Sequence, residues 1–285
     1  MKVVEDFTDY KIIGMGNGEK LEVWKNVTLL RPDPQIVWPW ISTKKTYDAR
    51  YIRSKSGGGS WDIIRSVPSS WQVNYKDLTF NLKLMGFKHT GLFPEQAYNW
   101  NLIREKIKSA NREIKVLNLF AYTGGATIAA ASVNARVVHV DSSKGMIDWA
   151  KENVKASKLE DKSIRFLVDD CVKFVKRELR RGNKYDVILM DPPSFGRGSN
   201  GEVWDIEKDL YELVEDCSKL LSDNPLLFII NSYTTGLSMS VLENILNLTV
   251  NKKIKGTISS DELGIKEENS EIVLPCGIYA RWENK

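Results

Sequence analysis

Cysteine and histidine are scarce in this chain of 285 residues. The cysteines are Cys171, Cys217 and Cys276, without a Cys-x-x-Cys pair, and the histidines are His89 and His139. This set is too sparse for a disulfide framework or for a zinc site, so we expect no bound metal. The absence of paired cysteines also favours a reducing compartment, the cytoplasm.

Long apolar runs are missing as well. No stretch of about 18 apolar residues is available to cross a bilayer, and residues 1–10 lack the apolar core of a secretory signal. We therefore expect a cytoplasmic protein with no membrane association. A hydrophobic content of 42% and a charged content of 27% are typical of a globular chain with a sizeable core. The sequence does not indicate an oligomeric state.

Positive charge is modest overall but concentrated near the N-terminus. Residues 1–90 contain 14 Lys/Arg and 9 Asp/Glu, whereas the rest of the chain contains 27 and 28. Aromatic residues, Tyr47, Tyr51 and Trp61, lie among six of the basic ones: Lys44, Lys45, Arg50, Arg53, Lys55 and Arg65. Such a mixture suits single-stranded RNA, while a solvated basic face is an equal alternative.

From about residue 111 the chain alternates β-rich apolar runs with helical segments. This alternation predicts an α/β fold, a doubly wound parallel sheet. The expected strands are residues 114–119, 136–141, 164–168, 185–191 and 226–231. The expected helices, after an Ala-rich one that follows the first strand, are residues 144–157, 172–181, 207–221 and 240–248. Two later segments, 254–259 and 272–282, are expected to form a terminal strand pair.

The first part of the chain has a different pattern. Residues 1–87 contain many turn residues, short alternating stretches and five of the nine tryptophans, which predicts a small β-rich N-terminal domain before a catalytic domain over 88–285. Four of these tryptophans are expected mainly in the core of that domain, with stacking on bases as the alternative: Trp24, Trp38, Trp40 and Trp71.

A glycine turn and acidic residues follow the expected parallel strands. Gly124 and Gly125 open a helix after the first strand, and Asp141 ends the second, where an acid can accept hydrogen bonds from a ribose. Asp170 follows the third strand and can accept the exocyclic amine of adenine, with a helix N-terminal acid as the alternative. These positions predict a nucleoside cofactor, and the missing Gly-x-Gly-x-x-Gly pattern disfavours a nicotinamide or a flavin.

The fourth strand ends in the sequence Asp-Pro-Pro-Ser-Phe, residues 191–195. Two prolines cannot donate to a sheet ladder, so they impose a rigid turn that leaves Asp191 and local carbonyls facing the cleft. Phe195 can then stack on a flat substrate. The next segment, 196–201, is expected to be a flexible basic loop that either closes over a substrate or simply connects two elements.

Together, residues 118–125, Asp141, Asp170 and residues 191–195 resemble the class I S-adenosylmethionine-dependent methyltransferases. The resemblance covers about residues 85–282 and is to the branch of bacterial large-subunit ribosomal RNA methyltransferases that act on cytosine C5 and guanine N7. It implies a Rossmann-like sheet of seven strands with the last one antiparallel. The PUA-type RNA-binding domain of many relatives has no match here.

The resemblance also implies S-adenosylmethionine as cofactor and assigns residues to it. Phe93 and Gln96 would pack over its methionine end, residues 118–125 would cradle the methionine portion, Asp141 would bind the ribose and Asp170 the adenine. Cys171 is expected to be a packed residue rather than a nucleophile. The full predicted cofactor set is Phe93, Gln96, Asn118, Phe120, Ala121, Tyr122, Thr123, Gly124, Asp141, Ser142, Asp170, Cys171 and Asp191.

The acceptor site departs from the cytosine C5 relatives in one respect. They carry a cysteine just after the fifth strand, which adds to the pyrimidine ring, and this chain has residues 231–233, Asn-Ser-Tyr, there. We therefore expect methyl transfer to a nucleobase of RNA, at a base nitrogen of ribosomal RNA rather than cytosine C5. The predicted acceptor residues are Asp191, Pro192, Phe195 and Asn231. The alternatives are a small-molecule or protein methyltransferase and a non-catalytic S-adenosylmethionine- or RNA-binding protein.

Overall fold

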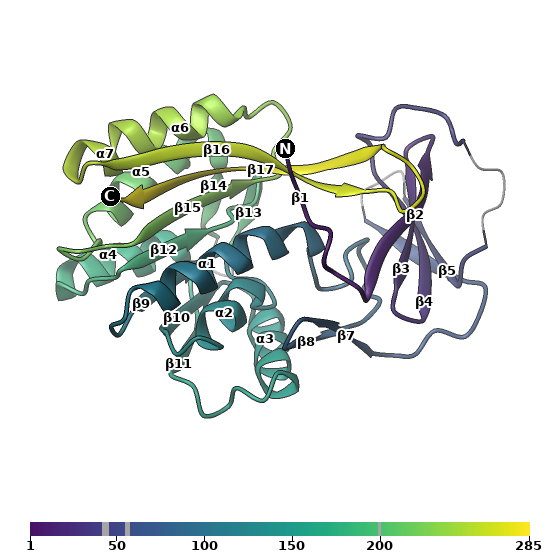
Figure 1. Ribbon diagram of the computed structural model, residues 1–285, viewed down its shortest axis with the longest axis horizontal. Coiled ribbons are helices and arrows are strands. Elements are labelled where there is room, and N and C mark those ends of the chain that lie inside the picture. Colours follow the sequence, from purple (N-terminus) through teal and green to yellow (C-terminus); the bar gives the residue numbers. More distant parts are fainter. Residues whose placement is uncertain (42–45, 55–57, 199–200) are drawn as a thin grey trace. The chain divides into compact units, whose positions relative to one another are not determined.

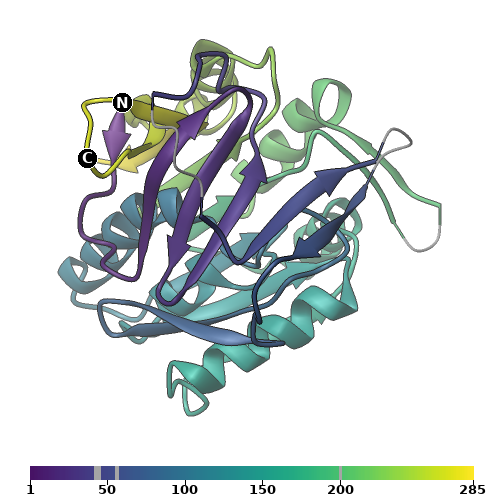
Figure 2. The same ribbon diagram turned by 90° about the vertical axis from the view of Figure 1, so that its right-hand side faces the viewer.

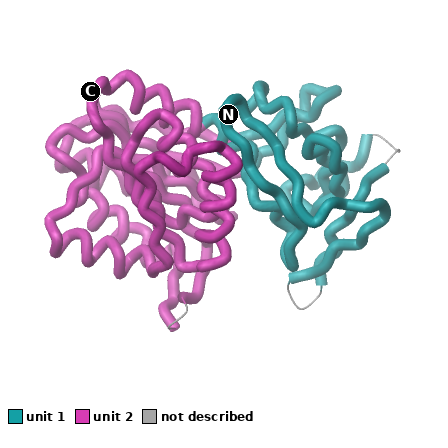
Figure 3. Tube along the Cα trace, turned by 90° about the horizontal axis from the view of Figure 1, so that it is seen from below, with its two compact units in different colours: residues 1–98, 264–276 teal, residues 99–263, 277–285 magenta. Residues whose placement is uncertain are grey.

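The computed structural model describes residues 1–41, 46–54, 58–198 and 201–285. Its contacts divide the chain into two compact units, coloured separately in Figure 3. Unit 1 contains residues 1–98 and 264–276, and unit 2 contains residues 99–263 and 277–285. The functional division at residue 87 stays a prediction. No helix within the described residues is long and apolar enough to span a membrane.

The largest sheet has eight strands in the order β1-β16-β17-β15-β12-β9-β10-β11 (Figure 1). The strands are β1 (Lys2–Val3), β9 (Lys115–Leu119), β10 (Arg136–Asp141), β11 (Ile164–Val168), β12 (Val187–Met190), β15 (Leu227–Ser232), β16 (Gly256–Lys266) and β17 (Val273–Asn284). The five strands β9, β10, β11, β12 and β15 pair in parallel, while β17 pairs antiparallel to β15. The predicted doubly wound sheet with an antiparallel last strand is confirmed. The short β1 adds an eighth strand beside β16.

Strand β9 occupies the centre of the parallel region. It pairs with β10 on one side and with β12 on the other, so Asn118 lies opposite both His139 and Leu189. The chain winds outward in opposite directions from this point, which makes the carboxyl ends of β9 and β12 the topological switch point. Every residue of β12 and of β15 is buried, as expected for parallel strands covered on both faces.

Helices cover both faces of the unit 2 sheet. They are α1 (Ala97–Ser109), α2 (Gly125–Ala131), α3 (Lys144–Ala156), α4 (Cys171–Arg181), α5 (Ile206–Ser218), α6 (Met239–Leu248) and α7 (Val250–Lys253). On one face, Asn118 of β9 contacts Thr127 of α2. On the other, Leu117 and Leu119 join the apolar core formed with helices α4 to α7 (Figure 1). Because side chains alternate along a strand, the two helix groups lie on opposite faces.

Helix α1 was not predicted, since the regular pattern was expected to begin near residue 111. Its buried residues Trp100, Ile103 and Ile107 follow helical spacing. The indole of Trp100 packs against Gly125, where an added Cβ would lie 2.7 Å from the ring. A side chain at position 125 would therefore separate the start of α2 from α1.

Unit 1 is β-rich, as predicted (Figure 2). Its five-stranded sheet runs in the order β2 (Tyr10–Gly16), β3 (Glu19–Trp24), β4 (Val27–Pro32), β5 (Ala49–Arg53) and β6 (Gly59–Ile63). A separate hairpin joins β7 (Trp71–Tyr75) to β8 (Leu78–Leu82), and a 3-10 turn, η1, spans Pro94–Gln96. Trp24 is fully buried, whereas Trp38, Trp40 and Trp71 are half-buried. Trp24 is therefore a core residue, as expected, whereas the other three are only partly in the core.

Candidate active site

The turn between β9 and α2 has an unusual backbone. Phe120, Tyr122 and Gly124 all have positive φ, at 52°, 51° and 88°. Such conformations are unfavourable for residues with a side chain, at about 1–3 kcal/mol each, and they persist only where the surroundings impose them. The amide of Ala121 donates to the carbonyl of Val140 (3.1 Å), which fixes the turn to β10. Residues 120–124 thus form a preorganised loop at the carboxyl end of the central strand.

A buried polar network supports this loop from below. The Asn118 amide donates to Thr127 Oγ1 (2.9 Å), which lies 2.9 Å from Nδ1 of the fully buried His139. Asn153, also fully buried, donates to the carbonyl of Thr123 (2.9 Å). Burial lowers the pKa of His139 to about 3, so its imidazole is neutral. The sequence predicted Asn118 but missed the other three, because their partners come from distant parts of the chain.

Asp141 connects the loop to the end of β10. One carboxylate oxygen accepts the amide of Tyr122 (2.9 Å) and the other accepts the amide of Ser143 (2.8 Å). Burial raises the pKa of Asp141, and these two hydrogen bonds oppose the rise. Each oxygen keeps lone-pair capacity for another donor, so a ribose with two hydroxyls fits this carboxylate. The neighbouring Ser142 is exposed at the same edge.

The residues that follow β11 have separate structural roles. Asp170 caps α4 by accepting the amide of Lys173 (2.8 Å), so the helix-capping interpretation applies to one of its oxygens. The other oxygen has no partner among the described residues. Cys171 is 3% exposed, and its Sγ accepts the amide of Phe120 (3.3 Å). Burial raises the pKa of this thiol, consistent with the expected packed residue.

The Asp191-Pro-Pro segment leads into a short hairpin of β13 (Phe195–Arg197) and β14 (Val203–Asp205). Pro192 is buried, while the Phe195 ring is 56% exposed. The Ser194 hydroxyl lies 2.7 Å from that of Thr234, which follows β15. This hydrogen bond ties the two segments at the carboxyl ends of β12 and β15 together. In the segment 196–201, expected to be a flexible loop, Gly196 and Arg197 belong to β13, whereas Gly198 and Gly201 lie outside the strands.

Asn231 lies at the carboxyl end of β15 and is 8% exposed. Its Oδ1 accepts a hydrogen bond from the amide nitrogen of Asn99, which is 2% exposed (3.0 Å). This contact fixes the amide plane of Asn231. Because its oxygen faces Asn99, the side-chain N–H groups of Asn231 point away from Asn99. Asn99 was not singled out from the sequence, because it belongs to the unpredicted helix α1 and no local pattern marks an amide pair.

The remaining predicted residues belong to unit 1. Gln96 is 8% exposed at the end of η1, and Phe93 is half-buried with its ring 5.3 Å from that of His89. Among the predicted RNA-contact residues, Arg50 pairs with Glu19 (2.8 Å) and Arg65 with Asp48 (3.6 Å). Arg53 is exposed, and Lys44, Lys45 and Lys55 lie outside the described residues.

The aromatic residues predicted beside those cations are less available than the sequence indicated. Tyr51 is 4% exposed, and the indole of Trp61 donates to the carbonyl of Met85 (2.8 Å). The two rings pack edge to face at 5.4 Å. Tyr51 is therefore a core residue of unit 1, and the expected stacking surface does not include it.

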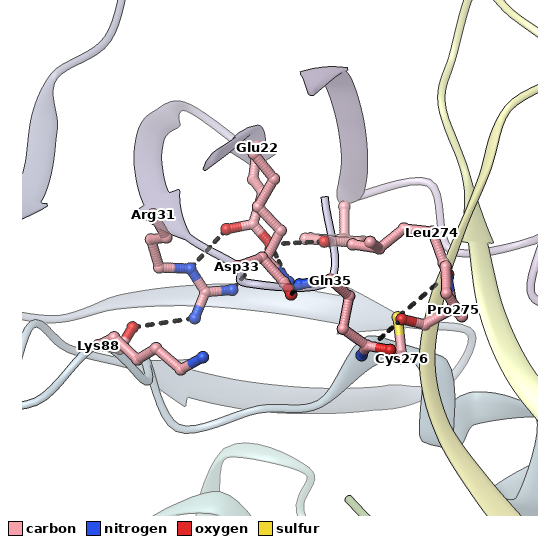
Figure 4. Close-up of polar contacts among 10 residues, drawn as sticks. Glu22, Arg31, Asp33, Gln35, Lys88, Leu274, Pro275 and Cys276 are labelled. Atoms are coloured by element: carbon pink, nitrogen blue, oxygen red, sulfur yellow. Dashed lines mark hydrogen bonds and ion pairs between the residues drawn. The ribbon is translucent and has the colours of Figure 1, made fainter. Parts of the chain in front are cut away.

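A buried ion pair lies between strands β3 and β4 of unit 1 (Figure 4). The Arg31 guanidinium donates to both oxygens of Glu22 (2.5 and 2.8 Å) and to the carbonyl of Lys88 (3.0 Å). Burial alone would raise the pKa of Glu22, but the attraction of Arg31 and Lys20 outweighs it and lowers the pKa to about 2. The pair remains charged throughout the neutral range.

Known proteins resemble this chain in sequence. A family model described as S-adenosylmethionine-dependent methyltransferase matches residues 48–248. Ribosomal RNA large subunit methyltransferase K/L of Shewanella frigidimarina (strain NCIMB 400) is 37% identical over 155 residues, 54% of this chain and 21% of that protein. The K/L enzyme of Pseudoalteromonas atlantica is 36% identical over 173 residues, which are 60% of this chain and 24% of that protein. The chain thus spans about a quarter or less of the length of these relatives.

Solved structures resemble it over nearly its whole length. A SAM-dependent methyltransferase from Agrobacterium tumefaciens has a TM-score of 0.93 and 34% identity, covering 99% of this chain and 92% of that one. A structure from Streptococcus mutans has 19% identity and a TM-score of 0.72, covers 98% of this chain and 76% of that one, and supports the fold alone. The match to the family model and the likeness to the Agrobacterium structure show that this chain belongs to the S-adenosylmethionine-dependent methyltransferases, with S-adenosylmethionine as its cofactor.

Proposed function

We propose that this methyltransferase transfers the methyl group to a base nitrogen of ribosomal RNA. The observation that carries the proposal is the exposure of Phe195, two residues after the Asp191-Pro-Pro turn at the carboxyl edge of the sheet. A large aromatic side chain that is more than half exposed on a short, fixed strand suits stacking on a flat acceptor. The names of the K/L relatives support RNA as the source of that acceptor.

The cofactor is proposed to lie along the carboxyl ends of β9, β10 and β11. The loop of residues 120–124 would hold its methionine portion, Asp141 the ribose hydroxyls and the free oxygen of Asp170 the adenine amine. Phe93 and Gln96 remain proposed contacts to the methionine end. Asn118, Thr123 and Cys171 are mostly buried, so their proposed role is to shape the loop from below.

Methyl transfer from a sulfonium requires in-line placement of the acceptor and exclusion of water. The nitrogen lone pair forms the new bond to carbon while the carbon–sulfur bond breaks, and an acceptor amine then loses a proton to solvent. The proposed contributions of this chain are positional. Phe195 fixes the plane of the base, while Asp191 and Asn231 orient its polar edge.

A base nitrogen is preferred to cytosine C5 because C5 chemistry needs a cysteine thiolate. Burial raises the pKa of all three thiols, those of Cys171, Cys217 and Cys276. Cys217 is fully buried on α5 and Cys171 serves as a packed residue beneath the loop. The segment after β15 holds Asn231, Ser232 and Tyr233 instead.

The test is transfer of a labelled methyl group from S-adenosylmethionine to total RNA from a strain that lacks this gene, followed by mass spectrometry of the nucleosides. The proposal predicts label in one methylated base nitrogen of ribosomal RNA. Labelled 5-methylcytosine would overturn the cysteine argument. Absence of RNA labelling by protein that binds the cofactor would instead favour a small-molecule or protein acceptor.

A further inference from the structure

The hairpin of β13 and β14 has two different faces. Its register places Phe195 opposite Asp205, Gly196 opposite Trp204, and Arg197 opposite Val203. Residues opposite each other in an antiparallel pair lie on the same face, and alternate residues along a strand share a face. One face therefore presents Phe195, Arg197, Val203 and Asp205, and the other presents Trp204.

The Trp204 face is fixed to the body of unit 2. The indole is 7% exposed, its nitrogen donates to the carbonyl of Pro193 (2.6 Å), and its ring packs on that of Phe120 at 5.2 Å. The amide of Ile206 donates to the carbonyl of Ser194 (3.1 Å) and closes the base of the hairpin. An isolated two-stranded hairpin is marginally stable in water, so these contacts account for its order.

The opposite face exposes apolar surface and the positive charge of Arg197, while the Asp205 carboxylate on the same face pairs with Lys208 (2.6 Å). Phe195 is 56% and Val203 58% exposed, and the Arg197 guanidinium lies 6.0 Å from the centre of the Phe195 ring. No acidic partner of Arg197 is found among residues 1–41, 46–54, 58–198 and 201–285. The nearby Glu202 pairs with Lys173 instead. Exposed apolar area next to a free arginine is complementary to a base and its phosphate.

We propose that this face binds the nucleotide that flanks the methylated one in a single-stranded RNA, with Arg197 on the phosphate between them and Val203 against the flanking base or ribose. The inference rests on the proposed function and extends it by one nucleotide. Side chains two residues apart on a strand are separated by about 6.6 Å. Arg197 therefore extends the surface from Phe195 along the strand by about this distance. The rigid anchoring by Trp204 means that little ordering entropy is lost on binding.

The test is the salt dependence of binding to a short, single-stranded RNA oligonucleotide of mixed sequence. Each phosphate contact contributes about 0.7 to the slope of log affinity against log salt for a single strand. Arg197→Ala is therefore expected to reduce the slope by about 0.7, while Arg197→Lys keeps it. Val203→Ala should weaken binding without changing the slope. The matched control is Arg136→Ala, since Arg136 is also exposed but begins β10 at the amino end of the sheet.

A wild-type slope in Arg197→Ala, or an equal reduction in Arg136→Ala, would overturn the inference, and the first result would favour a protein partner for this face. Failure of the inference is separable from failure of the proposed function. RNA methylation by wild type together with an unchanged slope in Arg197→Ala rejects the flanking site alone. A reduced slope in that variant supports the site even where the methyl acceptor proves to be different.

Discussion

At the residue scale, Gly124 combines a left-handed backbone with close packing. An added Cβ would lie 3.1 Å from that of Ala150, so Gly124→Ala adds crowding to backbone strain. We expect a loss of about 1–3 kcal/mol of stability and at least a tenfold weaker affinity for S-adenosylmethionine, measured by thermal unfolding and calorimetry. The control is Gly182→Ala, which has the same strain at φ 68° but open space around it. Equal cofactor affinity in the two variants would contradict the assigned role of the loop.

Asn99 offers a second test at this scale. Asn99→Ala removes the hydrogen bond that orients Asn231, at a cost of about 0.5–1.5 kcal/mol, and should reduce kcat about threefold to tenfold. Binding of S-adenosylmethionine should stay unchanged, because Asn231 is a proposed acceptor residue and not a proposed cofactor contact. Asn247→Ala, which removes an exposed amide on α6 from its contact with Asn251, is the control. A fall in cofactor affinity alone would show that Asn99 acts elsewhere.

At the scale of elements, the sequence predicted best where a repeated pattern extends over whole strands. Strands β10 and β11 have the predicted bounds because their apolar runs end at acidic residues. Strand β16 extends to Lys266, well beyond the predicted residue 259, because pairing on both sides satisfies its polar backbone despite a polar sequence. The short β1, β13 and β14 carry too few residues for any periodicity to show.

Residues of the candidate site were likewise predictable only where a local sequence pattern marks them. Its acidic residues, glycine turn and double proline are marked locally, so the sequence indicated them. The partners of Asn118 and Asn231 depend on tertiary packing, which brings Thr127 and Asn99 to them from other elements, and His139 to Thr127. Nothing in a single sequence indicates such pairs before the fold is known.

Strands β3 and β4 provide an element-scale prediction through Glu22 and Arg31. The pKa of Glu22 is depressed from its usual 4.5 to about 2, so the pair stabilises unit 1 fully above pH 4.5 and loses this effect as the pH falls toward 2. Glu22→Gln should cost about 3–5 kcal/mol at neutral pH and flatten the acid limb of a pH titration of unfolding. Glu212→Gln, at an exposed pair with Lys176, should change neither. If the stability of Glu22→Gln fell with acid as steeply as that of the wild type, the stabilising role assigned to the Glu22–Arg31 pair would be wrong.

At the scale of the whole molecule, cofactor binding should be visible as stabilisation. S-adenosylmethionine at 100 times its Kd should raise the free energy of unfolding by about 2.7 kcal/mol through mass action. Asp141→Ala removes the proposed ribose acceptor and should largely abolish the shift in a thermal unfolding experiment. Asp161→Ala, at a highly exposed carboxylate, should retain it. An undiminished shift in Asp141→Ala would place the ribose elsewhere.

At this scale we propose that the molecule methylates a base nitrogen of ribosomal RNA. It is tested most directly by mass spectrometry of ribosomal RNA nucleosides from the parent strain, a deletion strain and the deletion strain complemented with the wild-type gene. We expect one methylated base nitrogen to disappear on deletion and to return on complementation. An unchanged set of modified nucleosides in the deletion strain, or the loss of 5-methylcytosine alone, would contradict it.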